Sequence, residues 1–137
     1  MPDTYIYRKQ HSEIIKIIEE MIPFLDFDQI SEDPITIHGL FIKLSEKLFP
    51  HMTLEAKNLY PYLYIHQDNE VRIPAIRFYY KHKEMMRDLE EYMMKWDKPD
   101  SIKKRPFEFI KDCNVFCETL RLRIDKENNE LFPLVEK

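Results

Sequence analysis

Four stretches of the chain carry apolar residues every three or four positions, the spacing that gathers side chains on one face of an α-helix. They cover about residues 7–24, 34–63, 69–95 and 106–131. Asp33 followed by Pro34 is a typical helix start, because aspartate caps free N–H groups and proline fits the first turn. The connections are short, so the pattern predicts an all-α fold, an up-down-up-down four-helix bundle.

One face of each stretch is apolar, and charged residues occupy the opposite face. The four inner faces consist of Tyr7, His11, Ile14, Ile15, Ile18 and Ile22; of Leu40, Leu44, Leu48 and His51; of Ala75, Phe78, His82, Met85, Met86, Leu89 and Met93; and of Phe109, Cys113, Phe116, Leu120, Arg123 or Ile124, and Glu127. We interpret Met94, together with the methionines of the third face, as flexible core filler.

Several features interrupt the helical pattern. The acidic segment at 25–33 and the polar segment at 96–101 predict loops between helices. Pro50 lies inside the second stretch, where we expect either a kink or two segments nearly end to end, because proline lacks a backbone donor. Residues 60–65 are apolar enough to suit a short strand as well as a helix.

Composition excludes several classes of protein. Gly39 is the single glycine among 137 residues, whereas dinucleotide folds, phosphate-binding loops and hairpin-rich β folds need many. A net charge of −4 argues against nucleic acid as a partner. The length suits one domain over residues 1–137, and Cys113 and Cys117 suit reduced thiols packed in a core. With no signal-like start and no long apolar run, we expect a cytoplasmic protein without a membrane partner.

A repeated motif carries the chemistry. His51-x3-Glu55-x3-Leu-Tyr-Pro and Arg123-x3-Glu127-x3-Leu-Phe-Pro have the same spacing. Residues four apart stack on one helical face, so an imidazole and a carboxylate converge on one point. The aromatic-Pro pair is expected to end the helix or reshape its last turn. His11 and His82 lie on the inner faces of the other two helices, so every helix offers a metal-capable side chain.

This pattern resembles the hemerythrin-like (HHE cation-binding) domains in length, helical layout and repeated motif. The resemblance implies a carboxylate-bridged di-iron centre that binds oxygen or nitric oxide, or responds to iron and redox state. It implies metal ligation by His11, His51, Glu55, His82 and Glu127, with one iron served by His11 and His51, the other by His82, and both bridged by the two glutamates. Iron suits these ligands, and manganese or zinc would also fit.

Arg123 departs from the family pattern, because it stands where the resemblance calls for a histidine. A guanidinium stays protonated and cannot ligate a metal. Two arrangements remain open. Arg123 points outward and leaves a weak second site, or it points inward and its charge replaces the second cation beside Glu127 or Glu55. Either arrangement predicts one tightly held metal ion.

Three functions follow from these residues. We favour a binding protein for a small ligand (oxygen or nitric oxide) or for iron. A metal-dependent enzyme that activates oxygen or peroxide ranks lower, because no general acid or base beyond the ligands is visible. The third hypothesis is a bundle that has lost its metal and serves as an interaction module, and Arg123 supports it.

Overall fold

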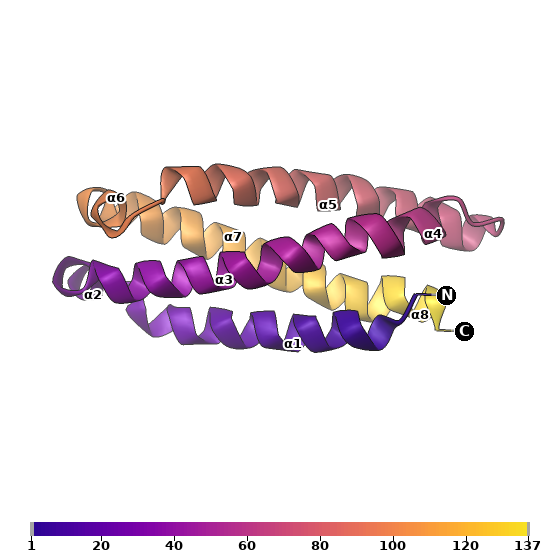
Figure 1. Ribbon diagram of the computed structural model, residues 1–137, viewed down its shortest axis with the longest axis horizontal. Coiled ribbons are helices and arrows are strands. Elements are labelled where there is room, and N and C mark those ends of the chain that lie inside the picture. Colours follow the sequence, from indigo (N-terminus) through magenta and orange to yellow (C-terminus); the bar gives the residue numbers. More distant parts are fainter. Residues whose placement is uncertain (1, 137) are drawn as a thin grey trace.

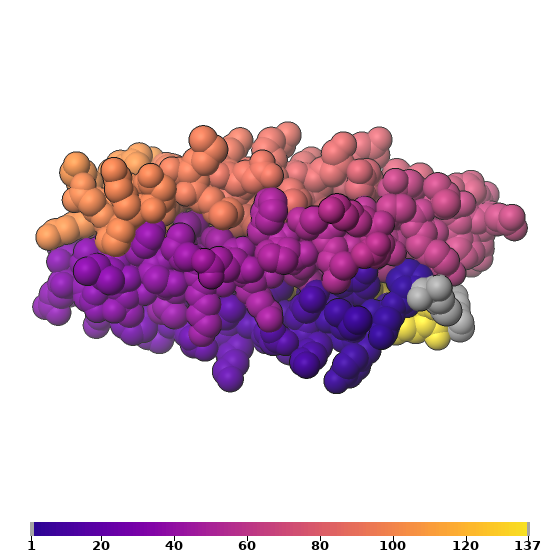
Figure 2. Space-filling view, viewed as in Figure 1, coloured from indigo at the N-terminus to yellow at the C-terminus, as the bar shows by residue number. Residues whose placement is uncertain are grey.

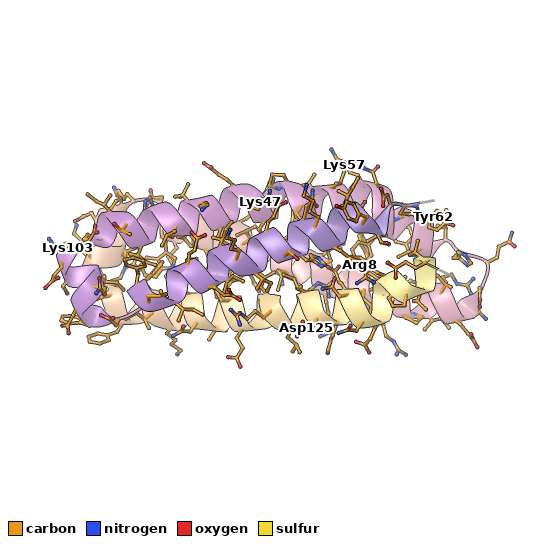
Figure 3. The ribbon with its side chains drawn as sticks, turned by 90° about the horizontal axis from the view of Figure 1, so that it is seen from below. Arg8, Lys47, Lys57, Tyr62, Lys103 and Asp125 are labelled. Atoms are coloured by element: carbon orange, nitrogen blue, oxygen red, sulfur yellow. The ribbon has the colours of Figure 1, made fainter. Side chains whose placement is uncertain are left out.

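The computed structural model describes residues 2–136 and confirms the all-α bundle (Figure 1). Four long helices lie side by side: α1 (Thr4–Met21), α3 (Pro34–Leu54), α5 (Asn69–Lys95) and α7 (Pro106–Lys126). Both termini lie at the end opposite α2 (Phe27–Glu32) and α6 (Pro99–Lys104). The space-filling view shows one elongated body, and charged side chains such as Lys57 and Lys103 project from its surface (Figures 2 and 3).

Aspartates and prolines set the helix starts. The side chains of Asp3, Asp33 and Asp68 each accept a hydrogen bond from a backbone N–H in the first turn of α1, α3 and α5. Pro34 and Pro106 occupy the first turns of α3 and α7, where no intrahelical N–H partner is needed. The predicted Asp33-Pro34 start is therefore confirmed.

Both expected loops were wrong in part, because each contains a short helix. In α2 the side chain of Asp26 caps the first turn, and α6 begins at Pro99. Each helix places one isoleucine in the core, Ile30 and Ile102, both fully buried. These isoleucines close one end of the bundle. Six-residue helices are too short for their periodicity to stand out in a sequence.

The second and fourth stretches continue beyond their long helices through wide turns. After α3 the backbone forms a π-helical turn, η2 (Glu55–Leu59), and then α4 (Tyr60–Tyr64). After α7 the same succession appears as η3 (Glu127–Leu131) and α8 (Phe132–Val135). A 3₁₀ turn, η1 (Ile22–Phe24), ends α1.

Pro50 does not divide the second stretch, so of the two alternatives, a kink or two segments, the second was wrong. It lies inside α3 on the exposed side, where solvent can reach the carbonyl that loses its N–H partner. The alternative of a strand at 60–65 was also wrong, because α4 covers most of it.

Two apolar clusters fill the interior and flank a polar layer. The larger cluster includes Ile14, Leu48, Leu89 and Leu120, and the smaller cluster lies toward the termini. The smaller cluster consists of Tyr7, Leu59, Tyr60, Leu63, Val71, Ala75, Leu131, Phe132 and Val135. The inner faces were predicted correctly except at their edges. Ile22 is 54% exposed in the 3₁₀ turn, and Met94 is 79% exposed beside the half-buried Met93.

Among residues 2–136, no helix is both long enough and apolar enough to cross a membrane. Cys113 and Cys117 are buried free thiols whose sulfur atoms lie 4.0 Å apart, as the sequence predicted.

Core packing predicts a large contrast between two positions on α5. Leu89→Ala should lower the free energy of unfolding by about 2–5 kcal/mol, because Leu89 is fully buried. Met94→Ala is the matched control and should change it by less than about 0.5 kcal/mol. Chemical denaturation followed by circular dichroism measures both. Equal losses at the two positions would contradict the packing described here.

Candidate metal centre

Six polar side chains lie in the dry layer between the two apolar clusters, each less than one tenth exposed. They come from all four long helices or from the turns that follow: His11, His51, Glu55, His82, Arg123 and Glu127. A buried charge is costly unless a group of opposite charge is close. The arrangement of these six side chains therefore needs an electrostatic explanation.

Four of the predicted ligands converge on one point. His11, His51, Glu55 and Glu127 each offer a ligand atom, and these atoms all lie within 4.8 Å of one another. His11 Nε2 lies 3.0 Å from Glu127 Oε1, and His51 Nε2 lies 3.1 Å from Glu55 Oε1. Metal–ligand bonds of about 2.0–2.2 Å place neighbouring ligand atoms roughly 3.0–3.5 Å apart. The spacing suits a single metal ion.

His82 lies beside this group but outside it. Its Nδ1 is 3.7 Å from Glu55 Oε1, on the side of the cluster nearer α5. Tyr60 packs against the imidazole, with ring centroids 4.9 Å apart. The imidazole of His82 thus faces Glu55 from a second direction.

The outer nitrogen of each imidazole lies next to a hydrogen-bond acceptor. His11 Nδ1 donates to Asn128 Oδ1 at 2.8 Å, His51 Nδ1 to Gln10 Oε1 at 2.6 Å, and His82 Nε2 to the Met52 carbonyl at 2.9 Å. A neutral imidazole carries one N–H, so these bonds leave a lone pair on each inner nitrogen. All three inner nitrogens are therefore prepared as ligands.

The inward-facing atoms lack donors. His11 Nε2, Glu55 Oε2 and His82 Nδ1 are buried without a hydrogen-bond partner among the described residues. Lone pairs of nitrogen and oxygen face one another at about 3 Å, which is unfavourable unless a cation or proton lies between them. The donor set therefore fits a metal ion of the iron, manganese or zinc type.

The protonation states agree with this description. Burial, together with the neighbouring His11, lowers the pKa of His51 to about 3, and burial lowers the pKa of His82 to about 4. Both imidazoles are therefore neutral at pH 7. Burial and the charge of Glu127 raise the pKa of Glu55 well above its ordinary value. Burial acts in the same direction on Glu127, and the positive charge of Arg123 opposes it.

Wide helical turns present the two carboxylates. Each π turn begins at a glutamate, and the Tyr60 and Phe132 N–H groups bond back to the carbonyls of Glu55 and Glu127, five residues earlier. Pro61 and Pro133 follow immediately, and proline cannot donate the next bond of a regular helix. The aromatic-Pro pair therefore reshapes the helix rather than ending it, and it does so in both copies of the motif.

Arg123 points into the bundle, which decides between the two arrangements open from sequence. Its Nη2 donates to Tyr60 Oη at 2.8 Å and also to the Phe78 carbonyl. Tyr60 Oη in turn donates to Glu127 Oε2 at 2.6 Å. Arg123 Nη2 lies 4.0 Å from that same carboxylate oxygen. The guanidinium thus balances the charge of Glu127 at short range, partly through a tyrosine.

The hydrogen bonds of Tyr60, Gln10 and Asn128 to the site residues were not predicted from the sequence. Each lies next to a residue of the site or inside its motif: Gln10 precedes His11, Asn128 follows Glu127, and Tyr60 is the motif's aromatic residue. Their proximity was visible, but their hydrogen bonds depend on how the helices rotate against one another. Tyr7 packs edge-on against His51 at 6.2 Å. His38 and His66 are both half-buried and lie outside the cluster.

Comparison with known proteins gives one match. The family model described as hemerythrin HHE cation binding domain matches residues 3–135. No curated protein matches the chain. No solved structure matches it either.

Substitution of the two carboxylates should have different effects on the stability of the metal-free protein. Glu127→Gln removes a charge that Arg123 and Tyr60 stabilise, so unfolding free energy should fall by about 3 kcal/mol at pH 7. Glu55→Gln resembles the protonated Glu55 that its raised pKa predicts, and should change stability by less than about 1 kcal/mol. Denaturation in the presence of a chelator measures both. A larger loss from Glu55→Gln would reverse the assignment of charge.

Proposed function

The chain belongs to the hemerythrin HHE cation-binding family, and we propose that it binds one non-haem iron ion through His11, His51, Glu55 and Glu127. The proposal extends to His82 as a further ligand, because its Nδ1 lies 3.7 Å from Glu55 Oε1 on the side nearer α5. The protein would then serve in the binding of oxygen or nitric oxide, or in the handling of iron.

One observation carries this proposal. Three imidazoles donate outward to fixed acceptors and turn their lone pairs toward two buried carboxylates. Within the described residues, the donors that reach these carboxylates are Tyr60 and, at 4.0 Å, Arg123, and both approach Glu127 Oε2. A divalent cation would satisfy the remaining lone pairs. Mixed imidazole and carboxylate ligands suit iron, with manganese or zinc as the competing ions.

The residues around the metal position would hold and orient it. Gln10, Asn128 and the Met52 carbonyl fix the three imidazoles, and the π turns fix the two carboxylates. The apolar clusters on either side exclude water from the layer. When bound, iron supplies an open coordination position and a change of oxidation state, which is the chemistry needed for a diatomic ligand.

Arg123 restricts the site to one metal ion in this proposal. Its positive charge lies on the side of Glu127 where a second ion would share that carboxylate, and two cations so close repel strongly in a dry core. His82 would then complete the first ion's shell instead of serving a second. The side chain that replaces the family's histidine thus supplies charge in place of ligation.

Metal analysis tests the number of ions. Protein purified without chelator should contain close to one metal ion per chain, and Arg123→His should raise the content toward two. Arg123→Lys is the matched control, because it keeps the charge and should stay near one. Elemental analysis with an optical spectrum makes the measurement. Two irons in the unaltered protein would contradict the single site, and no metal with a chelator-independent melting temperature would favour the metal-free interaction module.

The hydrogen bonds made by the outer imidazole nitrogens should strengthen the affinity for the metal ion. Asn128→Ala removes the acceptor that fixes His11, so metal affinity should fall about 10- to 100-fold. Asn129→Ala provides the matched control. The side chain of Asn129 is exposed, so this substitution should leave the metal affinity unchanged. Competition with a chromophoric chelator gives both dissociation constants. An equal effect of the two variants would exclude a positioning role for Asn128.

A further inference from the structure

The outer face of α5 carries large apolar side chains in contact with solvent. Ile73, Ile76, Tyr80 and Met94 are all exposed, Tyr80 by 62% and Met94 by 79%. Seven residues separate Ile73 from Tyr80 and fourteen separate Tyr80 from Met94, so the three side chains form one stripe opposite the buried face of the helix. Single exposed apolar residues are ordinary, but a stripe with heptad spacing is typical of a helix that packs against another helix.

The charged residues of α5 are segregated by sign along the helix. Residues 71–83 contain no aspartate or glutamate, and their basic residues are Arg72, Arg77, Lys81 and Lys83. Residues 84–94 contain one basic residue, Arg87, and four acidic residues, Glu84, Asp88, Glu90 and Glu91. Helix α5 thus has a positive half and a negative half that meet between Lys83 and Glu84.

These charges are not balanced within one chain. Within residues 2–136, none of the lysine, arginine, aspartate or glutamate side chains from Arg77 to Glu91 forms an ion pair. Like charges even lie one turn apart, Arg77 beside Lys81 and Glu84 beside Asp88, and such pairs destabilise a helix. A partner with the opposite charges would offset this repulsion from outside.

A second copy of the same face, turned end for end, supplies the complementary charges. A 180° rotation about an axis between Lys83 and Glu84 brings residues at equal distances from this axis opposite one another. Arg77 then faces Glu90 of the partner subunit, and by symmetry the same contact forms a second time. Every charge of the positive half lies against the negative half of the other copy.

The same rotation also pairs the apolar side chains. Ile73 faces Met94 of the partner subunit, and Tyr80 faces Arg87 of the partner subunit, a pairing that permits a cation–π contact. The stripe from Ile73 to Met94 is about 30 Å long at 1.5 Å per residue. A strip of that length and about 10 Å wide is smaller than the roughly 800 Å² per partner of a standard interface, so we expect a dissociation constant in the micromolar range.

We propose that the outer face of α5 is the interface of an antiparallel homodimer, in which the positive half of each α5 packs against the negative half of the other. Helix α5 lies along one edge of the bundle, which leaves this face free of the other three long helices (Figure 1). An anionic membrane surface fits less well, because it would attract the positive half and repel the negative half of the same stripe. The proposal is independent of whether the site holds a metal.

Sedimentation velocity of the metal-free protein, from about 5 to 500 µM, tests the interface. The unaltered protein should dimerise in this range. Arg77→Glu should weaken the dimer at least about tenfold, because it places like charges opposite each other twice, and Arg77→Glu combined with Glu90→Arg should restore the affinity to within about threefold. Lys9→Glu on the exposed side of α1 is the matched control and should leave the dimer unchanged. A monomer at every concentration, or no restoration in the double variant, would overturn the proposal.

Cysteine cross-linking tests the antiparallel direction. Glu84→Cys places a thiol next to the proposed two-fold axis, so a short bismaleimide should link the two copies. Met94→Cys is the matched control, because an antiparallel arrangement keeps its two thiols about 30 Å apart along the helices. The unaltered protein gives the background from the buried Cys113 and Cys117. Efficient linking of Met94→Cys, or none of Glu84→Cys, would overturn the antiparallel interface.

Discussion

Electron-pair donors crowd into a dry layer of the bundle, and this crowding is the constraint on which the rest of the structure depends. Three inward-facing imidazole nitrogens and two carboxylates approach one another there, with Arg123 as the one buried cation among them in the described chain. Apolar packing alone does not offset the free-energy cost of burying these polar groups. It is held by hydrogen bonds on its outer side and by two apolar clusters above and below. A bound cation would offset the free-energy cost of burying this polar layer.

The two copies of the motif differ at one position, and that difference organises the site. In the first copy His51 faces Glu55 and supplies a ligand atom. In the second, Arg123 approaches Glu127 and forms the link to Tyr60, a residue of the first copy. The two halves of the bundle are therefore joined across the site by a charged hydrogen-bonded chain. A symmetric pair of histidines would ligate more metal but would lack this connection.

Much of this arrangement could be predicted from the sequence. The periodicity gave the four long helices, and the repeated spacing placed Glu55 and Glu127 on inner faces, because both features are local. The positions of Gln10, Asn128 and Tyr60 could not be predicted, since their contacts depend on the rotation and height of neighbouring helices. Whether Arg123 points inward depends likewise on a partner 63 residues away, the hydroxyl of Tyr60. The short helices α2 and α6 were missed because so few residues carry no clear period.

The π turns amount to one extra residue in each helix, and an extra residue rotates everything after it by about 100°. Leu59 and Tyr60, which end η2 and begin α4, are both fully buried, and so are Leu131 and Phe132 at the corresponding positions after α7. Each helix consequently carries two registers, one for the larger apolar cluster and one for the smaller. The glutamate lies at the junction between them. A single residue inserted into an ordinary bundle helix is thus a route by which a chain can add a carboxylate site without repacking either end.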